Sequence, residues 1–363
     1  MAWRCSGPDT HGGLEQEHPA SQRGAGADAR EPVVPTSLPS VLAVYAARIS
    51  PDDPLSGLEV AEQPAPQASD GWVRVKVAAC ALNHHDLWSL RGVGLASDKL
   101  PMILGCDAAG VTDDGREVVV HAVVGDPSAG GGDETLDPKR SLLSERYPGT
   151  LAEYVAVPER NIVDKPASLS FEQAACLPTA WLTAYRMLAT RARLEGPSKV
   201  LVQGAGGGVA TALIAIGKAL GHTVYVTSRE EGKRQQALAL GADAAFESGA
   251  RLPERVDAVM ETVGAATWSH SLKSLRPGGV VVVSGATSGP NPEADLNRVF
   301  FLQLSVVGST MGTRDELVGL LRLMDETGLR PLIDEVRPLA DARAAFERMD
   351  TGSVFGKLVL TTG

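Results

Sequence analysis

From about residue 166 the chain alternates between short apolar runs and longer amphipathic segments. The apolar runs are bounded by Gly and polar residues, as strands are, and the segments between them carry apolar residues at helical spacing. We predict strands at 199–203, 223–227, 256–260 and 280–285, and helices at 209–220, 230–240 and about 266–275. Strands that alternate with helices imply right-handed crossovers, so we predict an α/β fold with a parallel, doubly wound sheet.

Residues 41–165 follow a different pattern, with short apolar runs between Gly and Pro clusters and little helical periodicity. The runs include VLAVYAARI, WVRVKVAACAL, REVVVHAVVG and LAEYVAVP. They predict an all-β unit. In the tail, 308–363, we predict helices over 313–328 and 341–349 and a strand over 357–362, and we expect this tail to complete the first unit.

Residues 1–40 have no hydrophobic period and are rich in Gly, Pro, Ala and charge, which predicts a disordered extension. A length of 363 residues favours two folding units. The expected domains are therefore 41–165, completed by 308–363, and 166–307.

The net charge of −10 argues against a nucleic-acid partner, because binding phosphates requires concentrated Lys and Arg. No run of eighteen apolar residues exists, and the first thirty residues lack a hydrophobic signal core, so we expect no membrane association and a cytoplasmic location. The four cysteines are Cys5, Cys80, Cys106 and Cys176. They lie far apart and form no CxxC pair, which fits a reducing compartment. A small molecule is the expected partner.

A glycine-rich turn follows the strand predicted at 199–203. It reads Gly204-Ala205-Gly206-Gly207-Gly208 and continues into the helix with Val209 and Ala210. Such a turn lets backbone amides approach a pyrophosphate, and the next helix directs its positive dipole end there. Gly-rich turns also serve tight packing alone, but the strand–turn–helix context favours a dinucleotide site.

The end of the second strand indicates which dinucleotide is bound. An NAD site has an acidic residue there, which accepts hydrogen bonds from the ribose hydroxyls. This strand ends instead in Ser228 and Arg229. A hydroxyl and a guanidinium can bind the 2′-phosphate of NADP, with Lys233 one turn further on, so we predict NADPH. Alternatively, Arg229 and Lys233 belong to a solvated helix face whose positive charge is partly neutralised by Glu230 and Glu231.

Several segments together resemble the medium-chain dehydrogenase/reductase superfamily, closest to its zinc-independent quinone oxidoreductase branch. They are CALNHHDLWSLRG, LPMILGCDAAG, GTLAEYVAVP, AACLPTAWLTAYRML, AGGGVA before a helix ending KALG, and RPGGVVVVSG. The resemblance covers about residues 41–361 and implies a GroES-like β-rich catalytic domain beside a Rossmann domain. Ala210 stands where the family usually has Gly, at a position that mainly sets helix packing.

Alcohol dehydrogenases of this superfamily hold a catalytic zinc with Cys, His and Cys beside an acidic residue. The matching positions here are Asn83, Cys106 and Thr179, with Asp107 as the acidic neighbour. One soft ligand cannot hold zinc, which needs about three protein ligands in a catalytic site. Adjacent His84 and His85 would point to opposite faces of an extended segment, and the stretch 125–149, which matches the structural zinc lobe, has no cysteine. We expect no metal.

Without a Lewis acid, alcohol oxidation is disfavoured. Hydride addition to the β-carbon of a conjugated acceptor requires less, because the acceptor's own carbonyl delocalises the charge and an amide can stabilise the enolate. We therefore expect an NADPH-dependent reductase of a quinone, enone or enoyl thioester.

The resemblance also implies roles for individual residues. Thr183 and Val209 should flank the nicotinamide, and the backbone near Val263-Gly264, Ser284-Gly285 and Thr310-Met311 should receive its carboxamide and ribose. Asn83 would donate to the acceptor beside the reacting carbon, although it could be a turn residue, and Trp88 would form a substrate wall, although it could be ordinary core. The proton donor is unassigned; His85 titrates near neutrality but could be structural.

Four other functions are either excluded or stay open. No tyrosine has a lysine four residues later, which excludes a short-chain dehydrogenase, and a methyltransferase would need an acid after the second strand. A zinc-type alcohol dehydrogenase and an NADPH-binding sensor with weak catalysis remain. The apolar run FFLQLSVVGS could pair two copies into a homodimer, but a buried strand reads the same way.

Overall fold

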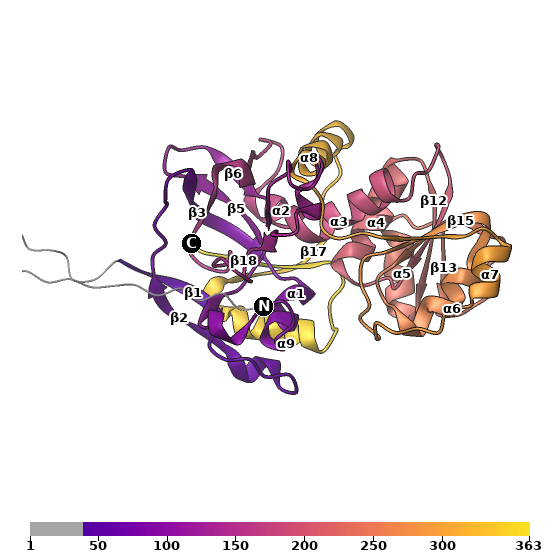
Figure 1. The fold of residues 1–363 in the computed structure, drawn as a ribbon, viewed down its shortest axis with the longest axis horizontal. Coiled ribbons are helices and arrows are strands. Elements are labelled where there is room, and N and C mark those ends of the chain that lie inside the picture. Colours follow the sequence, from indigo (N-terminus) through magenta and orange to yellow (C-terminus); the bar gives the residue numbers. More distant parts are fainter. Residues whose placement is uncertain (1–38) are drawn as a thin grey trace, which may run out of the picture. The chain divides into compact units, whose positions relative to one another are not determined.

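The computed structural model describes residues 39–363 (Figure 1). The disordered extension predicted for 1–40 lies outside the described residues, except that Ser40 already begins the first strand. None of the helices in the described part is both long and apolar enough to cross a membrane.

The strands of residues 40–164 and of the tail form β-sheets (Figure 1), and many of their side chains pack into a shared apolar cluster. The largest has the order β10-β6-β5-β3-β18-β17, with β9 also paired to β3, and a second sheet has the order β2-β1-β4. Strands β7 and β8 pair separately. The bounds are β1 Ser40–Ala46, β2 Leu58–Pro64, β3 Trp72–Ala81, β4 Met102–Ile103, β5 Asp107–Thr112, β6 Glu117–Val120, β7 Val123–Val124, β8 Ser141–Leu142, β9 Tyr154–Pro158, β10 Ile162–Asp164, β17 Ile333–Pro338 and β18 Lys357–Thr361.

The tail joins the first of these sheets directly. Strand β18 lies antiparallel to β3, with Leu360 opposite Cys80, and β17 lies parallel to β18. Two helices belong to the tail, α8 (Arg314–Thr327) and α9 (Ala342–Asp350). Segments far apart in the sequence therefore build one sheet and share one apolar cluster.

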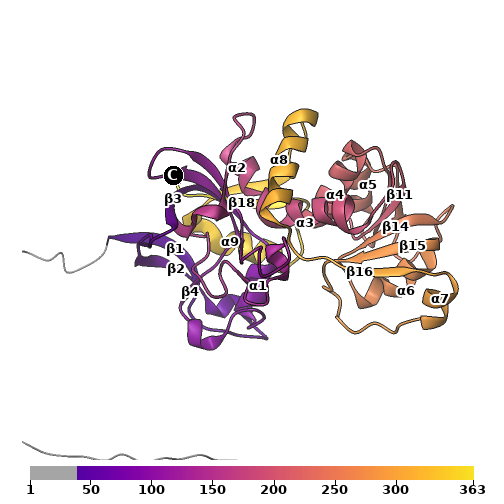
Figure 2. The same ribbon diagram turned by 45° about the horizontal axis from the view of Figure 1, so that its top comes forward.

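The middle of the chain forms a six-stranded, fully parallel sheet of order β13-β12-β11-β14-β15-β16. Figure 2 shows α4 and α5 on one face and α6 and α7 on the other. The bounds are β11 Lys199–Gln203, α4 Gly208–Ala219, β12 Thr223–Ser228, α5 Glu231–Ala239, β13 Ala244–Glu247, β14 Val256–Glu261, α6 Ala265–Ser274, β15 Leu275–Val283, α7 Leu296–Phe301 and β16 Ser305–Gly308. The predicted α/β class with a doubly wound parallel sheet is confirmed.

Short helices connect these two parts. Helix α2 (Phe171–Ala175) is followed by the π-helical turn η5 (Leu177–Trp181), α3 (Leu182–Tyr185) and a second π-helical turn η6 (Arg186–Arg191). The remaining 3-10 turns are η1 Pro54–Gly57, η2 Ser97–Lys99, η3 Glu134–Leu136, η4 Glu159–Asn161 and η7 Leu339–Asp341.

One prediction about the first unit is wrong. His84 and His85 do not lie in an extended segment but begin helix α1 (His84–Leu90). Asn83 precedes the helix with an extended backbone, and its N–H donates to Oδ2 of Asp86 at 2.8 Å, which fixes the helix start. Helix α1 has only two turns, which is too short for a helical spacing of apolar residues to be recognised in the sequence.

Candidate functional site

The dinucleotide turn joins β11 to α4 with a backbone that suits glycine. Gly204 has φ +81°, a left-handed conformation that other residues rarely adopt. Gly207 precedes α4 and provides no side-chain cap. No protein side chain therefore accepts hydrogen bonds from the N–H groups of the first turn. A Cβ built on Gly207 meets no atom within 4 Å. Open space at an uncapped helix N-terminus is what a pyrophosphate requires, so these residues fit a dinucleotide.

The residues predicted to bind the ribose phosphate lie beside this turn. Ser228 ends β12 and its Oγ accepts the N–H of Glu230 at 3.2 Å, while Arg229 is exposed. The stem of Lys233 covers Gly206, where an added Cβ would lie 2.9 Å from Cδ of the lysine. Nζ of Lys233 donates to Oε1 of Glu230 at 2.8 Å. Arg229 is therefore the more available cation of the two.

A buried carboxylate orders the loop after β14. Oε1 of Glu261 accepts the N–H groups of Val263 at 2.8 Å and Gly264 at 3.0 Å. Both Thr267 and Ser271 donate their hydroxyls to the same carboxylate. The two predicted cofactor residues Val263 and Gly264 thus have their N–H groups engaged within the protein, and a cofactor contact there would use other atoms.

A cavity of about 730 Å³ opens beside the carboxyl ends of β15 and β16. Four of the predicted site residues line it: Trp88, Ser284, Gly285 and Thr310. Val93 and Leu136 lie at its exposed rim, and Arg191 lines it from η6. A second cavity of about 360 Å³ shares Thr310 and includes Met311 and Glu145. Thr183, Ala205, Val209 and Ala210 line neither cavity; the first, second and fourth are buried and Val209 is half-buried.

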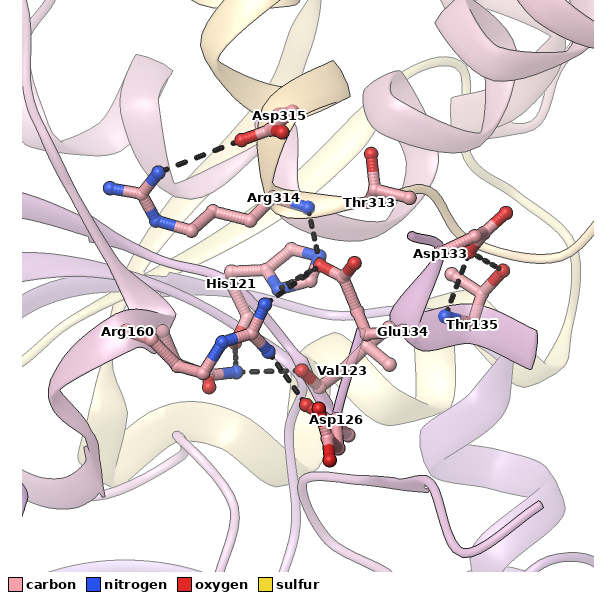
Figure 3. Close-up of polar contacts among 12 residues, drawn as sticks. His121, Val123, Asp126, Asp133, Glu134, Thr135, Arg160, Thr313, Arg314 and Asp315 are labelled. Carbon is pink, nitrogen blue, oxygen red and sulfur yellow. Dashed lines mark hydrogen bonds and ion pairs between the residues drawn. The ribbon is translucent and has the colours of Figure 1, made fainter. Parts of the chain in front are cut away.

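One wall of the larger cavity is tied to the start of α8 through Glu134. Its Oε1 accepts the backbone N–H of Arg314 at 2.7 Å and lies 3.7 Å from Nη2 of Arg160 (Figure 3). Next to it, Asp133 pairs at 2.5 Å with Arg186, a buried guanidinium that also contacts Glu316 at 2.8 Å. These ion pairs hold the segment that contributes Thr135 and Leu136 to the wall.

On the acceptor side a buried lysine meets the predicted amide. Nζ of Lys357 donates to Oδ1 of Asn83 at 2.7 Å, to the carbonyl of Leu82 at 2.7 Å and to Oδ2 of Asp107 at 3.1 Å. Lys357 is 3% exposed and Asp107 is fully buried. The sequence pattern places Lys357 only in the last strand. A charged residue opening an otherwise apolar strand was the available indication that it needs a buried partner.

His85 lies between a thiol and a carboxylate. Its Nε2 is 3.2 Å from Oε1 of Glu145, and its Nδ1 is 3.6 Å from Sγ of Cys106. Burial disfavours the protonated ring, but Cys106 and Glu145 outweigh burial and hold the pKa of His85 well above its usual value. Burial raises the pKa of the Cys106 thiol, whose Sγ donates to the carbonyl of Leu143 at 3.2 Å.

The helix places His85 beside the predicted substrate wall. His85 and Trp88 are three residues apart in α1 and so share one face. Trp88 lines the larger cavity and Glu145 lines the smaller one. His85 and Asn83 themselves line neither cavity, and His85 is joined to the smaller one through Glu145. Glu145 was missed because it lies sixty residues away in a loop without a motif.

The three positions that match zinc ligands in relatives do not present a zinc donor set. Oδ1 of Asn83 is bonded to the ammonium of Lys357, and Thr179 supplies a hydroxyl. Only Cys106 is a soft donor. Within residues 39–363, no group of three His, Cys, Asp or Glu side chains is close enough to hold a metal ion.

Two family models match the chain. An alcohol dehydrogenase GroES-like domain matches residues 69–167, and a zinc-binding dehydrogenase domain matches residues 208–326. The acryloyl-coenzyme A reductase of Metallosphaera sedula is 29% identical over 84% of this chain and 97% of its own. The quinone oxidoreductase of Mus musculus is 30% identical over 82% of this chain and 90% of its own.

A solved NAD-dependent alcohol dehydrogenase superposes with a TM-score of 0.81 at 34% identity, covering 89% of this chain and all of that one. The predicted GroES-like and Rossmann architecture is thereby confirmed. The chain belongs to the medium-chain dehydrogenase/reductase superfamily and is an oxidoreductase of that family.

Proposed function

We propose that the protein is an NADPH-dependent reductase that transfers hydride to a conjugated acceptor, a quinone, enone or enoyl thioester, without catalytic zinc. The observation that carries the proposal is the contact between Lys357 and Asn83, at a position where zinc relatives place a ligand. An amide bonded to an ammonium is a hydrogen-bond donor toward an acceptor oxygen and not a metal ligand. The names of the acryloyl-coenzyme A and quinone reductase relatives support the same class of acceptor.

The cofactor preference rests on the end of β12. Ser228 and Arg229 stand where an NAD site has an acid, and a carboxylate there would repel the 2′-phosphate. The exposed Arg229 has no ion pair within the described residues, so its guanidinium is available to the phosphate. The turn Gly204–Gly208, with Ala205, Gly207 and Gly208, and the start of the helix at Ala210 would hold the pyrophosphate. The residues that would surround the nicotinamide and its ribose are Thr183, Val209, Val263, Gly264, Ser284, Gly285, Thr310 and Met311.

NADPH, when bound, would supply one hydride to the β-carbon of the acceptor and leave as NADP⁺. The C=C pair would move toward the carbonyl carbon and the carbonyl pair onto oxygen, which would give an enolate. Nδ2 of Asn83 donates to that oxygen, and Trp88 forms the wall against which the acceptor packs. A proton then leaves protonated His85 for the α-carbon, and Glu145 orients the ring through Nε2.

We also propose a homodimer that pairs the edge strand β16 of two copies. Strand β16 pairs with β15 alone, and large apolar side chains are exposed on and before it: Leu296, Phe300, Phe301 and Val306. A single copy leaves this edge and its apolar residues in water, whereas antiparallel pairing of β16 with a second β16 satisfies both.

We place the protein in the cytoplasm. Cys80, Cys106 and Cys176 are buried free thiols, as in proteins of reducing compartments.

The deciding experiment is NADPH oxidation by the purified protein with 1,4-naphthoquinone, an enone and crotonyl-coenzyme A, and with NADH as the comparison cofactor. We expect turnover with at least one acceptor and a clear preference for NADPH. Binding of NADPH without turnover on any acceptor would replace the proposal with a sensor. One equivalent of zinc in the purified protein, with activity lost on chelation, would replace it with a zinc-type alcohol dehydrogenase.

A further inference from the structure

The ammonium of Lys357 uses all of its hydrogen-bonding capacity inside the protein. Its three N–H groups have three acceptors, the carbonyl of Leu82, Oδ1 of Asn83 and Oδ2 of Asp107. One carboxylate thus balances one ammonium, and both are removed from water. A buried ion pair costs desolvation and is weak evidence for a stabilising role. A role at the neighbouring site explains its presence better.

The contact determines which way the amide of Asn83 faces. An ammonium has no acceptor atom, so the amide atom next to Nζ must be the oxygen. The nitrogen Nδ2 then lies on the other side, where its nearest acceptor is the carbonyl of Ala81 at 3.4 Å. At least one N–H of Asn83 remains for a ligand. The positive charge at Oδ1 also polarises the amide and strengthens that N–H as a donor.

The same side chain reaches the cofactor helix. A Cβ added to Gly208, the first residue of α4, would lie 2.9 Å from Cδ of Lys357. The stem of Lys357 therefore packs against the dinucleotide turn while its head holds Asn83. One residue spans the distance between the hydride donor's helix and the acceptor's amide.

We propose that Lys357 is a positioning residue of the reductase, which fixes Asn83 as the donor to the oxygen of the conjugated acceptor and places a positive charge behind the developing enolate. This inference rests on the proposed function. The ammonium needs no substrate contact, because it acts through Asn83 as a fixed positive charge. A neutral side chain at residue 357 would leave the amide free to turn and its N–H less polar.

The test compares wild type with Lys357→Met, Lys357→Arg, Asn83→Ala and the double variant Asn83→Ala/Lys357→Met. We expect Lys357→Met to lower kcat for crotonyl-coenzyme A about 10²-fold, the usual effect of losing an oxyanion donor. The Kd of NADPH should change less than about twofold, and Lys357→Arg should recover part of kcat. The double variant should be no slower than Asn83→Ala alone, because both changes remove the same interaction.

A matched control is Lys165→Met. Lys165 is half-buried with a side chain only 5% exposed; its Nζ donates to the carbonyl of Leu169 at 2.7 Å and pairs with Glu117 at 2.9 Å, away from the site. This variant should lose thermal stability and keep kcat. If Lys357→Met does not fold, Asp107→Asn/Lys357→Met removes both charges together and takes its place.

Two results would overturn the inference. One is weaker NADPH binding with kcat intact, which would make Lys357 a cofactor ligand; the other is additive losses in the double variant. A readout without turnover separates this inference from the proposed function. The side-chain amide of Asn83, identified by its loss in Asn83→Ala, should shift and exchange faster with solvent in Lys357→Met. An unchanged amide signal would refute the inference even if the protein reduces an acceptor. A shifted amide signal would support the inference even if no acceptor is reduced.

Discussion

Nε2 of His85 lies 3.2 Å from Oε1 of Glu145, and the other ring nitrogen faces the thiol of Cys106. Burial opposes protonation of the ring, but the contacts with Cys106 and Glu145 outweigh it, so this arrangement holds the imidazole in one orientation and raises its pKa. A proton donor with these properties should stay active to higher pH than a free histidine.

The first prediction concerns Glu145→Gln and the pH dependence of enone reduction. In wild type, kcat/KM should be flat at low pH and fall as pH rises through the elevated pKa of His85, because only the protonated ring donates. Loss of the carboxylate lowers that pKa, so the fall should move to lower pH in the variant. The measurement is kcat/KM for one enone across the pH range.

Two comparisons make this prediction specific. Glu153→Gln changes another half-buried glutamate that accepts a backbone N–H, that of Leu42 at 2.8 Å, but contacts no histidine, and it should leave the pH profile in place. A quinone, whose reduced form is a stable anion, should be less sensitive to the change than an enone. Identical profiles for wild type and Glu145→Gln would remove His85 from proton donation.

The second prediction concerns Arg229→Ala. A lost charge-assisted contact with the 2′-phosphate is worth about 1.5–3 kcal/mol, so the Kd of NADPH should rise about 10- to 100-fold while that of NADH stays unchanged. The control is Arg255→Ala, an exposed arginine of the same Rossmann unit. Isothermal titration of both cofactors with both variants is the measurement, and equal losses for NADPH and NADH would exclude Arg229 from the phosphate site.

The Rossmann elements could be predicted closely because glycines and polar residues separate their apolar runs. Strand β11 agrees with its predicted residues 199–203, and α4 begins at Gly208, one residue before its predicted start. Strand β13, Ala244–Glu247, was missed because its residues are only partly buried and give no continuous apolar run.

The acceptor side could be predicted only in part. The motif around Asn83 indicated the amide, but its partner Lys357 lies 274 residues away and meets it only because β18 pairs with β3. Glu145 comes to His85 from a loop in the same manner. Local patterns do not encode such long-range contacts, and the extended conformation expected for His84 and His85 was wrong for the related reason that α1 is very short.

The third prediction concerns Gly207→Ala. The backbone at Gly207 has φ −76°, and an added Cβ meets no protein atom within 4 Å, so the variant should fold with an unchanged Tm. The methyl group would occupy space expected for the pyrophosphate, so the Kd of NADPH should rise about tenfold or more, which is about 1.4 kcal/mol. Gly232→Ala in α5, whose Cβ also meets nothing within 4 Å, should leave the Kd unchanged. Tight NADPH binding by Gly207→Ala would place the pyrophosphate elsewhere.

The fourth prediction concerns the edge strand β16. Phe301, 80% exposed, and Val306, 49% exposed, should be buried when two copies pair. The double change Phe301→Glu/Val306→Lys should therefore convert a dimer into a monomer, because it places charges in an apolar contact. Light scattering after size exclusion measures the mass. The exposed Val336→Lys on β17 is the control, and a wild-type monomer at high concentration would refute the proposed dimer.

The last prediction concerns Asp86, which holds the start of α1 against the loop before β5. Its carboxylate is fully buried and accepts the N–H groups of Asn83 at 2.8 Å and Gly105 at 3.1 Å, and burial raises its pKa to about 6. The unfolded value is about 3.9, so the native state holds this proton more tightly and its contribution to stability is lost as pH rises through about 6. Between about pH 4.5 and about pH 7.5 this loss is on the order of 2 kcal/mol.

Asp86→Asn removes the titrating group. The decrease in the free energy of unfolding that this substitution causes should therefore be smaller at the higher pH than at the lower one. Asp137, whose pKa is lowered by the N–H groups of Asp126 and Lys139, is ionised across this range, so the cost of Asp137→Asn should be nearly the same at both pH values. Urea unfolding of the three proteins at both pH values decides it, and an Asp86→Asn cost that does not change with pH would mean that Asp86 does not titrate in this range.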